Sequence, residues 1–384
     1  MTRVPVSKVN LASKPIVVFF EHVTVLDRFY LHKFLIAQAH EFINTKSIIY
    51  FCTMDDSKRL QKEFLDKYIP GALAINYKDK KSLKQIVPVA VFVSSVLTAL
   101  KLGFSNPFKI CQYHHILWYQ GIIPEESFLR RKSYLRKFVL ICVEQLAIRW
   151  ADVVLLPSDA MKEYLWKHKR LPQKKYVTIP NAIDNIPSIF LASRELWGLG
   201  DDNTPTIGYC GGISTWQCFE ETVMLVSDLQ RLCPELWFLV LTYDPHNAQE
   251  ILQRQKMSRF IIRTSAPEDT YRYVQAFDLG LLLRRSHPIN AVSFPLKYLD
   301  YMANGVPVCT TSAVDAIRED AEQNHGLVID LDRNEAEKVL DHLLNCVKAK
   351  EQIRDELRNH ASQQWTWKSA NAESRQVYAD IIGM

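Results

Sequence analysis

The stretch RRSHPINAVSFPLKYLDYMANGVPVCTT, residues 284–311, joins two apolar runs through a short helical pattern. The run before it, DLGLLLR at 278–284, and the run that closes it, VPVCTT at 306–311, have the length and composition of buried strands. Between them, apolar residues recur at the spacing of a helix, as Leu296, Leu299 and Met302. The stretch therefore predicts a strand–helix–strand unit, which is the repeating unit of a parallel sheet.

The ends of this helix are marked by two residues. Pro295 suits the first helical position, and Gly305 suits the residue just past the last. Lys297 is then unusual, because the helix dipole makes a cation in the first turn cost roughly 0.3–1 kcal/mol. An anion bound at the helix start would explain it, since backbone N–H groups, dipole and ammonium would all face the ligand. The alternative is a surface ion pair with Asp300, three residues on.

The same alternation of strands and helices runs through most of the chain. Before a polar stretch at 197–206, the strand-like runs are PIVVFFE, SIIYFC, VAVFVSSV, FKICQYHH, ADVVLLPS and KKYVTIPNAID. After it they are TIGYC, LWFLVLT, RFIIRT, DLGLLLR, VPVCTT and GLVID. A long helix is expected from about Glu126 to Trp150, and Ser158 can cap the helix that follows it. The predicted fold is α/β, with two tandem doubly wound Rossmann-like domains, and ligands are expected in the cleft that the two sheets face.

Composition narrows the class of protein. The chain has 384 residues, 48% hydrophobic and 23% charged, which fits two ordinary globular domains. No apolar run reaches the roughly 18 residues that span a bilayer, and the N-terminal residues do not read as a signal peptide. The eight cysteines show no C-x-x-C spacing, which favours reduced core thiols over a metal site or disulfides. We therefore expect a soluble, cytoplasmic protein.

The net charge of +5 is concentrated in two stretches. These are LRRKSYLRKF at 129–138 and KHKRLPQKK at 167–175. Neither has the interleaved aromatics or the motif of a nucleic-acid module, so no nucleic-acid partner is expected. Two interpretations stay open: the stretches are solvated helix faces and loops, or they contact an anionic membrane surface.

A glycine pair, Gly211 and Gly212, follows the strand TIGYC and precedes another helix. Glycines at such a turn let a ligand approach the backbone and expose amides to an anion. The pattern is not G-x-G-x-x-G, so it does not indicate a dinucleotide fold, and a plain tight turn explains it equally well.

Five segments together resemble the GT-B glycosyltransferases, most closely the retaining enzymes of family four (glycosyl transferases group 1). SFPLKYLDYMANGVPVCTT resembles the segment P-x-K-x-x-E-Y-x-A-x-G-x-P-V of that family, and IGYCGGISTWQ stands in the place of its glycine loop. EQLAIRWADVVLLPSDAMKEYL, IPNAID and WTWKSANAESRQVYADII are similar to three further segments, in the same order along the chain.

The resemblance implies an acceptor-binding domain at 1–184 and a nucleotide-sugar domain at 185–364. It also implies a C-terminal helix at 365–384 that packs back on the first domain. The nucleotide-sugar site would hold Gly211, Gly212, Arg284, Asn290, Ser293, Lys297 and Asp300. The resemblance implies that Lys297 contacts the diphosphate and that Asp300 contacts the ribose.

The chain also departs from the family pattern. Gly212 and Gln217 stand where Arg and Lys are usual, so the pyrophosphate would depend more on Lys297 and Arg284. The first Glu of the usual E-x7-E pair falls on Val292.

The acceptor side departs from the pattern as well. Gln120 stands where the family has a His, and Gln can hold a sugar hydroxyl but cannot act as a general base. His115, upstream, could approach the cleft. Glu126 could contact the acceptor, or simply belong to the acidic start of a helix. The candidate catalytic residues are therefore Gln120, His115 and Glu126.

The function implied by the resemblance is transfer of a sugar from a nucleoside-diphosphate sugar, as a glycosyltransferase of the hexosyltransferase type, with retention of configuration. The acceptor would be a glycan or polyprenyl-linked molecule in surface polysaccharide or glycolipid assembly, at the cytoplasmic face of the inner membrane. No cofactor is expected, and no carboxylate or His cluster has convincing metal-ligand spacing. The alternatives are a sugar-nucleotide epimerase of the same fold and a catalytically inactive scaffold that binds a nucleotide sugar.

Overall fold

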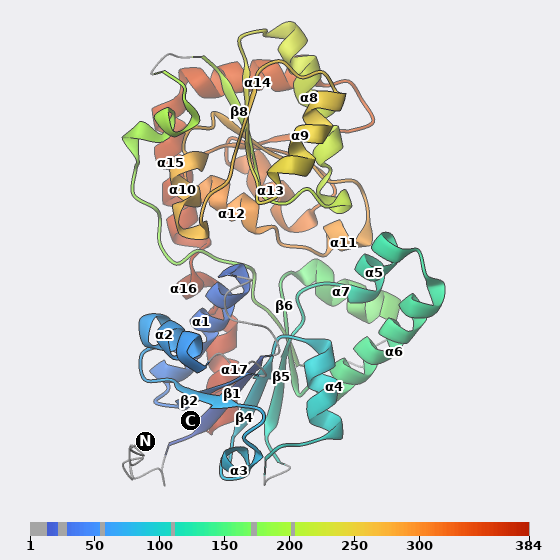
Figure 1. Ribbon diagram of the computed structural model, residues 1–384, viewed down its shortest axis with the longest axis vertical. Coiled ribbons are helices and arrows are strands. Elements are labelled where there is room, and N and C mark those ends of the chain that lie inside the picture. Colours follow the sequence, from blue (N-terminus) through green and yellow to red (C-terminus); the bar gives the residue numbers. More distant parts are fainter. Residues whose placement is uncertain are drawn as a thin grey trace. The chain divides into compact units, whose positions relative to one another are not determined.

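The computed structural model describes residues 14–21, 29–53, 58–108, 112–169, 175–200 and 204–383. These residues fall into two compact units (Figure 1). The first comprises the described residues up to Leu156, Leu165–Ile179 and the C-terminal segment from Asn371. The second comprises Pro157–Tyr164 and Pro180–Ala370.

The first unit is a parallel sheet with helices between its strands. Its strands are β1 (Ile16–Glu21), β2 (Ile48–Thr53), β3 (Leu73–Asn76), β4 (Ala90–Val93), β5 (His114–Trp118), β6 (Val153–Leu156) and β7 (Lys175–Thr178). Its helices are α1 (Phe29–Asn44), α2 (Lys58–Tyr68), α3 (Lys80–Leu83), α4 (Val96–Phe104), α5 (Ile123–Arg131), α6 (Tyr134–Trp150) and α7 (Asp159–Lys169), the last of which begins among residues of the second unit. The strand order β3-β2-β1-β4-β5-β6-β7 reverses beside β1, as in a doubly wound sheet.

Two sequence predictions for this unit are wrong in detail. The strand expected over FKICQYHH begins only at His114. Its apolar residues Ile116 to Trp118 pair with β6, and Lys109–Cys111 lie outside the described residues. The long helix expected from Glu126 to Trp150 is broken into α5 and α6. Lys132 takes a left-handed conformation (φ 51°), and the side chain of Ser133 accepts a hydrogen bond from the amide of Arg136, which caps α6.

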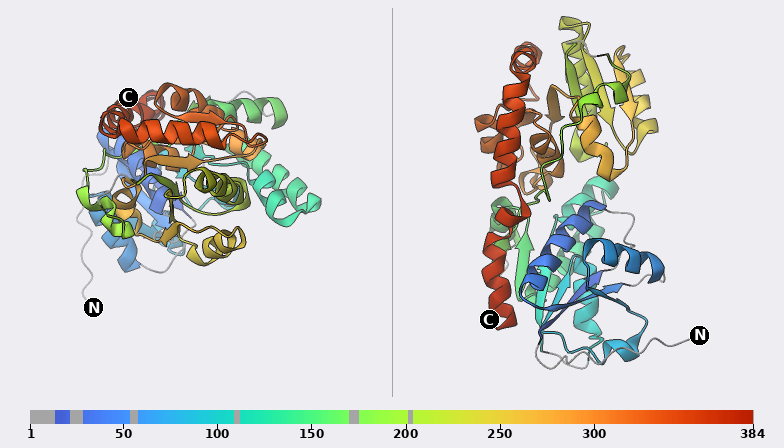
Figure 2. Two further views of the ribbon diagram at one scale, coloured as in Figure 1. Left: turned by 90° about the horizontal axis from the view of Figure 1, so that it is seen from above. Right: turned by 90° about the vertical axis from the view of Figure 1, so that its left-hand side faces the viewer.

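The C-terminal segment belongs to the first unit. After α15 (Lys350–Gln364), the predicted single helix is divided into α16 (Trp367–Ala370) and α17 (Ala372–Ile382). Between them, buried Asn371 accepts a hydrogen bond from Gln38 of α1 at 2.8 Å. Tyr378 of α17 stacks on Phe42 at 4.3 Å between ring centroids, so the last helix packs on α1; the right view of Figure 2 shows this last helix, in dark red at the C-terminus, in the first unit.

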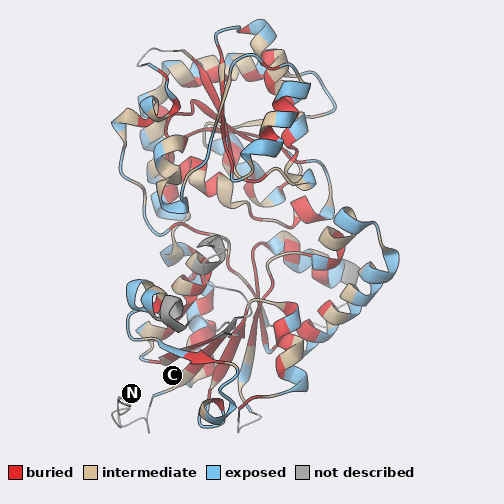
Figure 3. Cartoon of the chain, viewed as in Figure 1, coloured by how far each residue is buried: buried red, intermediate tan, exposed pale blue. Residues whose placement is uncertain are grey.

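The second unit repeats the architecture. Its strands are β8 (Thr206–Cys210), β9 (Trp237–Leu241), β10 (Phe260–Arg263), β11 (Leu279–Leu282), β12 (Val308–Thr311) and β13 (Leu327–Ile329). Its further helices are α8 (Phe219–Leu232), α9 (Pro245–Arg254), α10 (Thr270–Val274), α11 (Pro288–Ala291), α12 (Leu296–Ala303), α13 (Asp315–Gln323) and α14 (Ala336–Lys348), with four single 3-10 turns at Leu191–Ser193, Glu195–Trp197, Thr215–Gln217 and Pro267–Asp269. All strand pairs are parallel, in the order β10-β9-β8-β11-β12-β13. The central strands β8, β11 and β12 are buried throughout, whereas the edge strand β10 is only partly buried (Figure 3).

The expectation of two parallel, doubly wound sheets is confirmed. In the second unit the order reverses between β8 and β11, which pair with each other. Ligands of such sheets bind outside the carboxyl ends of the strands at this reversal. The glycine pair follows β8 and Arg284 follows β11, so both predicted stretches lie at that position.

Candidate functional site

Helix α12 carries the lysine on which the sequence argument depends. Its first residue is Leu296, so Lys297 lies in the first turn as expected, while Pro295 lies one residue earlier, with a non-helical ψ of 122°. Gly305 has φ +71°, and the amide of Val306 donates to the carbonyl of Tyr301, which closes the helix. The short helix is therefore bounded at both ends, which fixes where Lys297 points.

Tyr301 connects this helix to both strands at the reversal. Its buried hydroxyl accepts a hydrogen bond from the amide of Cys210, at the end of β8, at 2.9 Å. The same hydroxyl donates to the carbonyl of Leu281 in β11, at 3.3 Å. Gly280 leaves room for the ring, because an added Cβ there would lie 2.8 Å from Tyr301 Cδ2. One side chain thus holds α12 against the carboxyl ends of β8 and β11.

Lys297 reaches the glycine pair across this junction. A Cβ added at Gly211 would lie 3.1 Å from Lys297 Cε and 3.3 Å from Nζ, and Gly211 has φ +124°, which favours glycine. The ammonium also lies 3.9 Å from the centroid of the Tyr209 ring, a cation–π contact. The structure therefore brings together Gly211 and Lys297, which are 86 positions apart in the sequence.

Gln217 links the groups around the glycine turn. Its Oε1 accepts hydrogen bonds from Lys297 Nζ and from the Tyr209 hydroxyl, both at 3.1 Å. Its backbone carbonyl accepts from Arg284 Nη1 at 3.0 Å. The family that this chain resembles has a lysine at this position. Gln217 instead accepts hydrogen bonds from Lys297 through its side chain and from Arg284 through its backbone carbonyl.

Arg284 is the second cation at this position. Only 6% of its surface is exposed, and its Nη1 also donates to the carbonyl of Leu283 at 2.9 Å. Thr311 of β12 holds its backbone on both sides, since the hydroxyl donates to the Arg284 carbonyl and accepts from its amide. A buried guanidinium that is bonded to carbonyl oxygens keeps its full positive charge.

The electrostatics of these two cations favour an anionic ligand. Burial, together with the charge of Arg284, holds the pKa of Lys297 well below its ordinary value of 10.5. Burial also lowers the pKa of Arg284. Within the described part of the chain, neither side chain forms an ion pair. An anion placed here would restore the favourable interactions that the two groups lose on leaving water.

The remaining predicted donor residues lie in the same segment. Asp300, one turn after Lys297, is close enough to act electrostatically on Lys297 and on Cys210, whose thiol pKa is raised to about 12, chiefly by burial. Asn290 is buried and donates to the carbonyl of Arg285 at 2.9 Å. The hydroxyl of Ser293 donates to the carbonyl of Asn290 at 2.8 Å. Asn290 and Ser293 therefore brace the loop that leads to α12.

Two motifs noted in the sequence also hold this loop. The hydroxyl of Ser158 donates to the carbonyl of Val292 at 2.7 Å and accepts from the amide of Met161, so it caps α7 as expected. The side-chain amide of Asn181 donates to the carbonyl of Phe294, also at 2.7 Å. Ser158 and Asn181 thus hold the loop that leads to α12. These two residues and their bonding partners in the loop, Val292 and Phe294, all lie in the second unit.

In the first unit, Gln120 and Glu126 follow the carboxyl end of β5. Glu126 lies in the first turn of α5, and its Oε1 would be 2.6 Å from a Cβ added at Gly121. Its carboxylate is thus folded over the residue next to Gln120. Burial raises the pKa of Glu126, so it retains a proton to a higher pH than an exposed glutamate.

His115 lies at the other end of the same strand. It is the second residue of β5, its amide donates to Asp152 Oδ2 at 2.8 Å, and its ring stacks on Tyr113. At about 3.3 Å per residue, roughly 10 Å of strand separates it from Trp118, and Gln120 comes two residues after the strand ends. The structure therefore places Glu126 beside Gly121, the residue after Gln120, but does not bring His115 to them.

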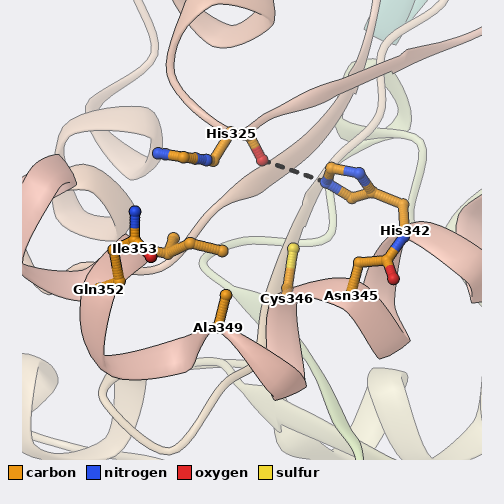
Figure 4. A pocket seen from close by; sticks show the side chains of 7 residues that line it. All are labelled: His325, His342, Asn345, Cys346, Ala349, Gln352 and Ile353. Carbon is orange, nitrogen blue, oxygen red and sulfur yellow. Dashed lines mark hydrogen bonds between the residues drawn. The ribbon is translucent and has the colours of Figure 1, made fainter.

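A pocket in another part of the second unit contains none of the predicted residues (Figure 4). It is lined by His325, His342, Asn345, Cys346, Ala349, Gln352 and Ile353. His342 of α14 bonds to the carbonyl of His325 at 3.1 Å, as the figure shows, and burial lowers the pKa of His342. Among the described residues, no group of three or more His, Cys, Asp or Glu side chains is arranged to hold a metal ion.

Sequence reasoning missed three residues that build the site. Tyr209 and Tyr301 read as apolar positions of a strand and a helix, and only their hydroxyl contacts show their role. Tyr243, after β9, is 78% exposed, and its hydroxyl would lie 2.5 Å from a Cβ added at Gly212. The lone aromatic after LWFLVLT was the available signal for Tyr243, because side chains at that position reach the ligand edge of the sheet.

Comparisons with known proteins agree with this geometry. Residues 65–185 match the family model described as Glycosyltransferase Family 4, and residues 204–348 match Glycosyl transferases group 1. The Bacillus subtilis (strain 168) protein TuaH, whose name assigns it to teichuronic acid biosynthesis as a glycosyltransferase, is 24% identical over 201 residues. That match covers 51% of this chain and about half (48%) of the length of TuaH.

Solved structures share the fold at low sequence identity. Sucrose-phosphate synthase from Thermosynechococcus elongatus superposes with a TM-score of 0.71 at 14% identity, over 96% of this chain and 100% of that one. Anabaena Alr3699/HepE in complex with UDP-glucose superposes with a TM-score of 0.70 at 13% identity, over 95% and 99%. The two family matches follow one another along the chain and fall on different sheets. The chain therefore belongs to the group 1 glycosyltransferases of the GT-B fold.

Proposed function

We propose that this chain transfers a glycosyl group from a nucleoside-diphosphate sugar to a hydroxyl of a glycan or lipid-linked acceptor. One observation carries the proposal: Arg284 lies buried and Lys297 half-buried at the β8–β11 reversal, beside Gly211, without an ion pair among the described residues. A diphosphate is the ligand whose charge and size fit two such cations at the carboxyl edge of a Rossmann-like sheet. The Anabaena HepE structures, which contain UDP-glucose or UDP, support the choice of donor.

In the proposed reaction, the bond between the anomeric carbon and the diphosphate oxygen breaks as the acceptor oxygen bonds to that carbon. The acceptor proton passes to the departing phosphate oxygen, so the products are the glycoside and a nucleoside diphosphate. Attack from the face that the diphosphate leaves gives retention of configuration. Negative charge grows on the diphosphate during this step, and Lys297 and Arg284 stabilise it electrostatically. The chain's own residues would supply that stabilisation without a metal ion.

The other groups take supporting roles in this scheme. Asp300, one turn below Lys297, accepts hydrogen bonds from the ribose hydroxyls. Gln120 and Glu126 in the first unit bind hydroxyls of the reacting sugar or of the acceptor. The name of TuaH supports a place in the assembly of a surface polysaccharide.

The proposal is tested by screening nucleotide sugars for thermal stabilisation, since a bound ligand raises apparent stability by mass action. We expect nucleoside-diphosphate sugars to raise Tm and the corresponding monophosphates to raise it much less. The stabilising donor is then incubated with acceptors in the presence of a chelator. Glycoside formation that survives the chelator supports the scheme. An absolute requirement for added Mg²⁺ or Mn²⁺ would contradict the assigned phosphate site.

Incubation of the same donor without acceptor separates transfer from other chemistry. Conversion of the donor into an epimer would identify an epimerase. Tight donor binding with no product from any acceptor would identify a binding protein.

A further inference from the structure

Helix α6 of the first unit has an exposed face that is apolar. Leu135, Val139, Cys142 and Leu146 follow one another at spacings of three or four residues, and Phe138 and Trp150 flank them; we call these six residues the α6 stripe. Leu135 is 76% exposed and Phe138 64%. At 1.5 Å per residue, the stripe extends for roughly 22 Å.

Helix α4 extends the same surface. Leu97 and Phe104 are seven residues apart, which places them on one face of α4, and both are exposed, Phe104 by 77%. Phe104 meets Trp150 edge to face, with the ring centroids 5.0 Å apart. Single exposed apolar side chains are normal, but monomers rarely present a contiguous set over two helices without a binding role.

Cations predominate around the stripe, although Lys137 of α6 pairs with Glu125 of α5 at 3.8 Å. Between Ser127 and Ala151 the sequence has six Lys and Arg residues and a single acid, Glu144. Glu144 is 1% exposed and accepts a hydrogen bond from the Tyr119 hydroxyl, so it adds no negative charge to the surface. Arg131 and Lys132 lie at the turn between α5 and α6, which stands away from the sheet in Figure 1 and in the left view of Figure 2.

We propose that the α6 stripe and its flanking cations dock on an anionic membrane surface. Apolar side chains along one face of a helix can enter the boundary between headgroups and acyl chains, while Lys and Arg bind the anionic headgroups. A second copy of this chain is a poorer fit, because self-association would bring like charges together. This surface belongs to the first unit alone and is independent of the proposed donor site.

None of the described helices is both long and apolar enough to cross a bilayer, so the proposal concerns peripheral contact. It is tested by co-sedimentation of the full chain with vesicles of phosphatidylcholine alone and of phosphatidylcholine mixed with phosphatidylglycerol. We expect binding to the anionic vesicles only, and less of it as salt increases. Equal weak binding to both vesicles at low salt would overturn the proposal.

Two pairs of variants locate the contact. Arg131→Gln combined with Lys132→Gln should weaken binding by tenfold or more, since each charge contributes about fivefold. Removing two exposed cations of the second unit, Arg231→Gln with Arg333→Gln, should have little effect. Phe138→Gln should also weaken binding, whereas Met224→Gln, at an exposed apolar position of α8, should not. Equal losses in the control variants would assign the binding to net charge or general apolarity and contradict the assigned surface.

Cys142 offers a direct measure of contact, because it is the exposed member among the free thiols of the described residues. An environment-sensitive fluorophore attached to it should shift to shorter wavelength on anionic vesicles, and Cys142→Ser should abolish the labelling that reports the shift. A label whose spectrum does not move on vesicles that bind the protein would overturn the proposed orientation. Light scattering completes the test: a dimer that Phe138→Gln converts to a monomer, without any effect on vesicle binding, would show that a second copy covers the stripe.

Discussion

The carboxyl edges of the two sheets are built for different kinds of ligand. At the edge of the second sheet, Lys297 and Arg284 are partly or fully shielded from water. They donate hydrogen bonds to the side-chain oxygen and to the backbone carbonyl of Gln217. At the edge of the first, Gln120 is followed by Glu126, a carboxyl that burial keeps protonated to a higher pH. Cations held at such an edge stabilise an anion strongly, whereas an amide and a carboxyl group bind hydroxyls through hydrogen bonds. The difference supports the proposed places of the diphosphate at one edge and of the sugar hydroxyls at the other.

The strongest test of this contrast is Lys297→Met, which keeps the bulk of the stem and removes the charge. A charge-assisted bond to a buried phosphate contributes about 1.5–3 kcal/mol, and more if it strengthens in the transition state. We expect kcat/KM for the nucleotide sugar to fall by roughly tenfold to a hundredfold or more. Lys348→Met, at an exposed position in the last turn of α14, is the matched control. Near-normal turnover by Lys297→Met would mean that α12 does not bind the diphosphate.

Asp300→Asn should have the next largest effect. The amide keeps the shape of the side chain but gives up the charge that strengthens a hydrogen bond to ribose. We expect nucleotide affinity to fall by about tenfold, to the same extent for the free nucleoside diphosphate and for its sugar conjugate. Calorimetric titration of both ligands measures this. A loss confined to the sugar conjugate would place Asp300 beside the sugar instead.

Glu126→Gln should act on the first unit's edge alone. Replacing the Glu126 carboxyl by an amide of the same shape changes the hydrogen bonds available near Gln120, so the acceptor KM should rise by roughly three- to tenfold. Donor binding, measured without acceptor, should stay the same. An equal loss of donor affinity would remove the distinction between the two edges.

The smallest expected effect concerns the stability of the protein without ligand. Because the pKa of Lys297 is lowered on folding, the half-buried ammonium costs stability in full below the folded pKa. That cost is relieved as pH rises from the folded pKa toward the ordinary value of 10.5. Lys297→Met should therefore be at least as stable as the wild type at neutral pH, to within about 1 kcal/mol.

The advantage of the variant should then shrink as the pH rises. Chemical denaturation of both proteins at about pH 7 and about pH 9 checks the sign. A difference that grows with pH would show that Lys297 is not desolvated in the folded protein.

Local patterns in the sequence were enough to find one half of the donor site. The position of Lys297 and the end of its helix at Gly305 follow from neighbouring residues, and so does the cap that Ser158 gives to α7. The partners could not be found in this way. Lys297 and Gln217 are 80 positions apart, and the contact exists only because β8 and β11 are neighbours in the sheet.

The errors on the acceptor side have physical causes too. FKICQYHH contains enough apolar residues to read as a strand, but β5 begins at His114, where pairing with β4 starts, and this leaves His115 far from Gln120. The break between α5 and α6 had a visible signal in Ser133, a good N-cap residue, although the surrounding residues all favour helix. The residues on both sides have helical propensity, so the sequence reads as one helix. The turn depends on the left-handed conformation of Lys132.

The most direct test of the role of Lys297 compares a nucleoside diphosphate with its monophosphate. Calorimetric titration gives the ratio of their dissociation constants for the wild type, for Lys297→Met and for Lys348→Met. We predict that the diphosphate binds at least about tenfold more tightly to the wild type and to Lys348→Met, since the second phosphate adds a charge-assisted contact. In Lys297→Met this ratio should fall severalfold, because Arg284 alone of the two cations is then left to bind the second phosphate. The same large ratio in all three proteins would contradict the assignment of the diphosphate to Lys297.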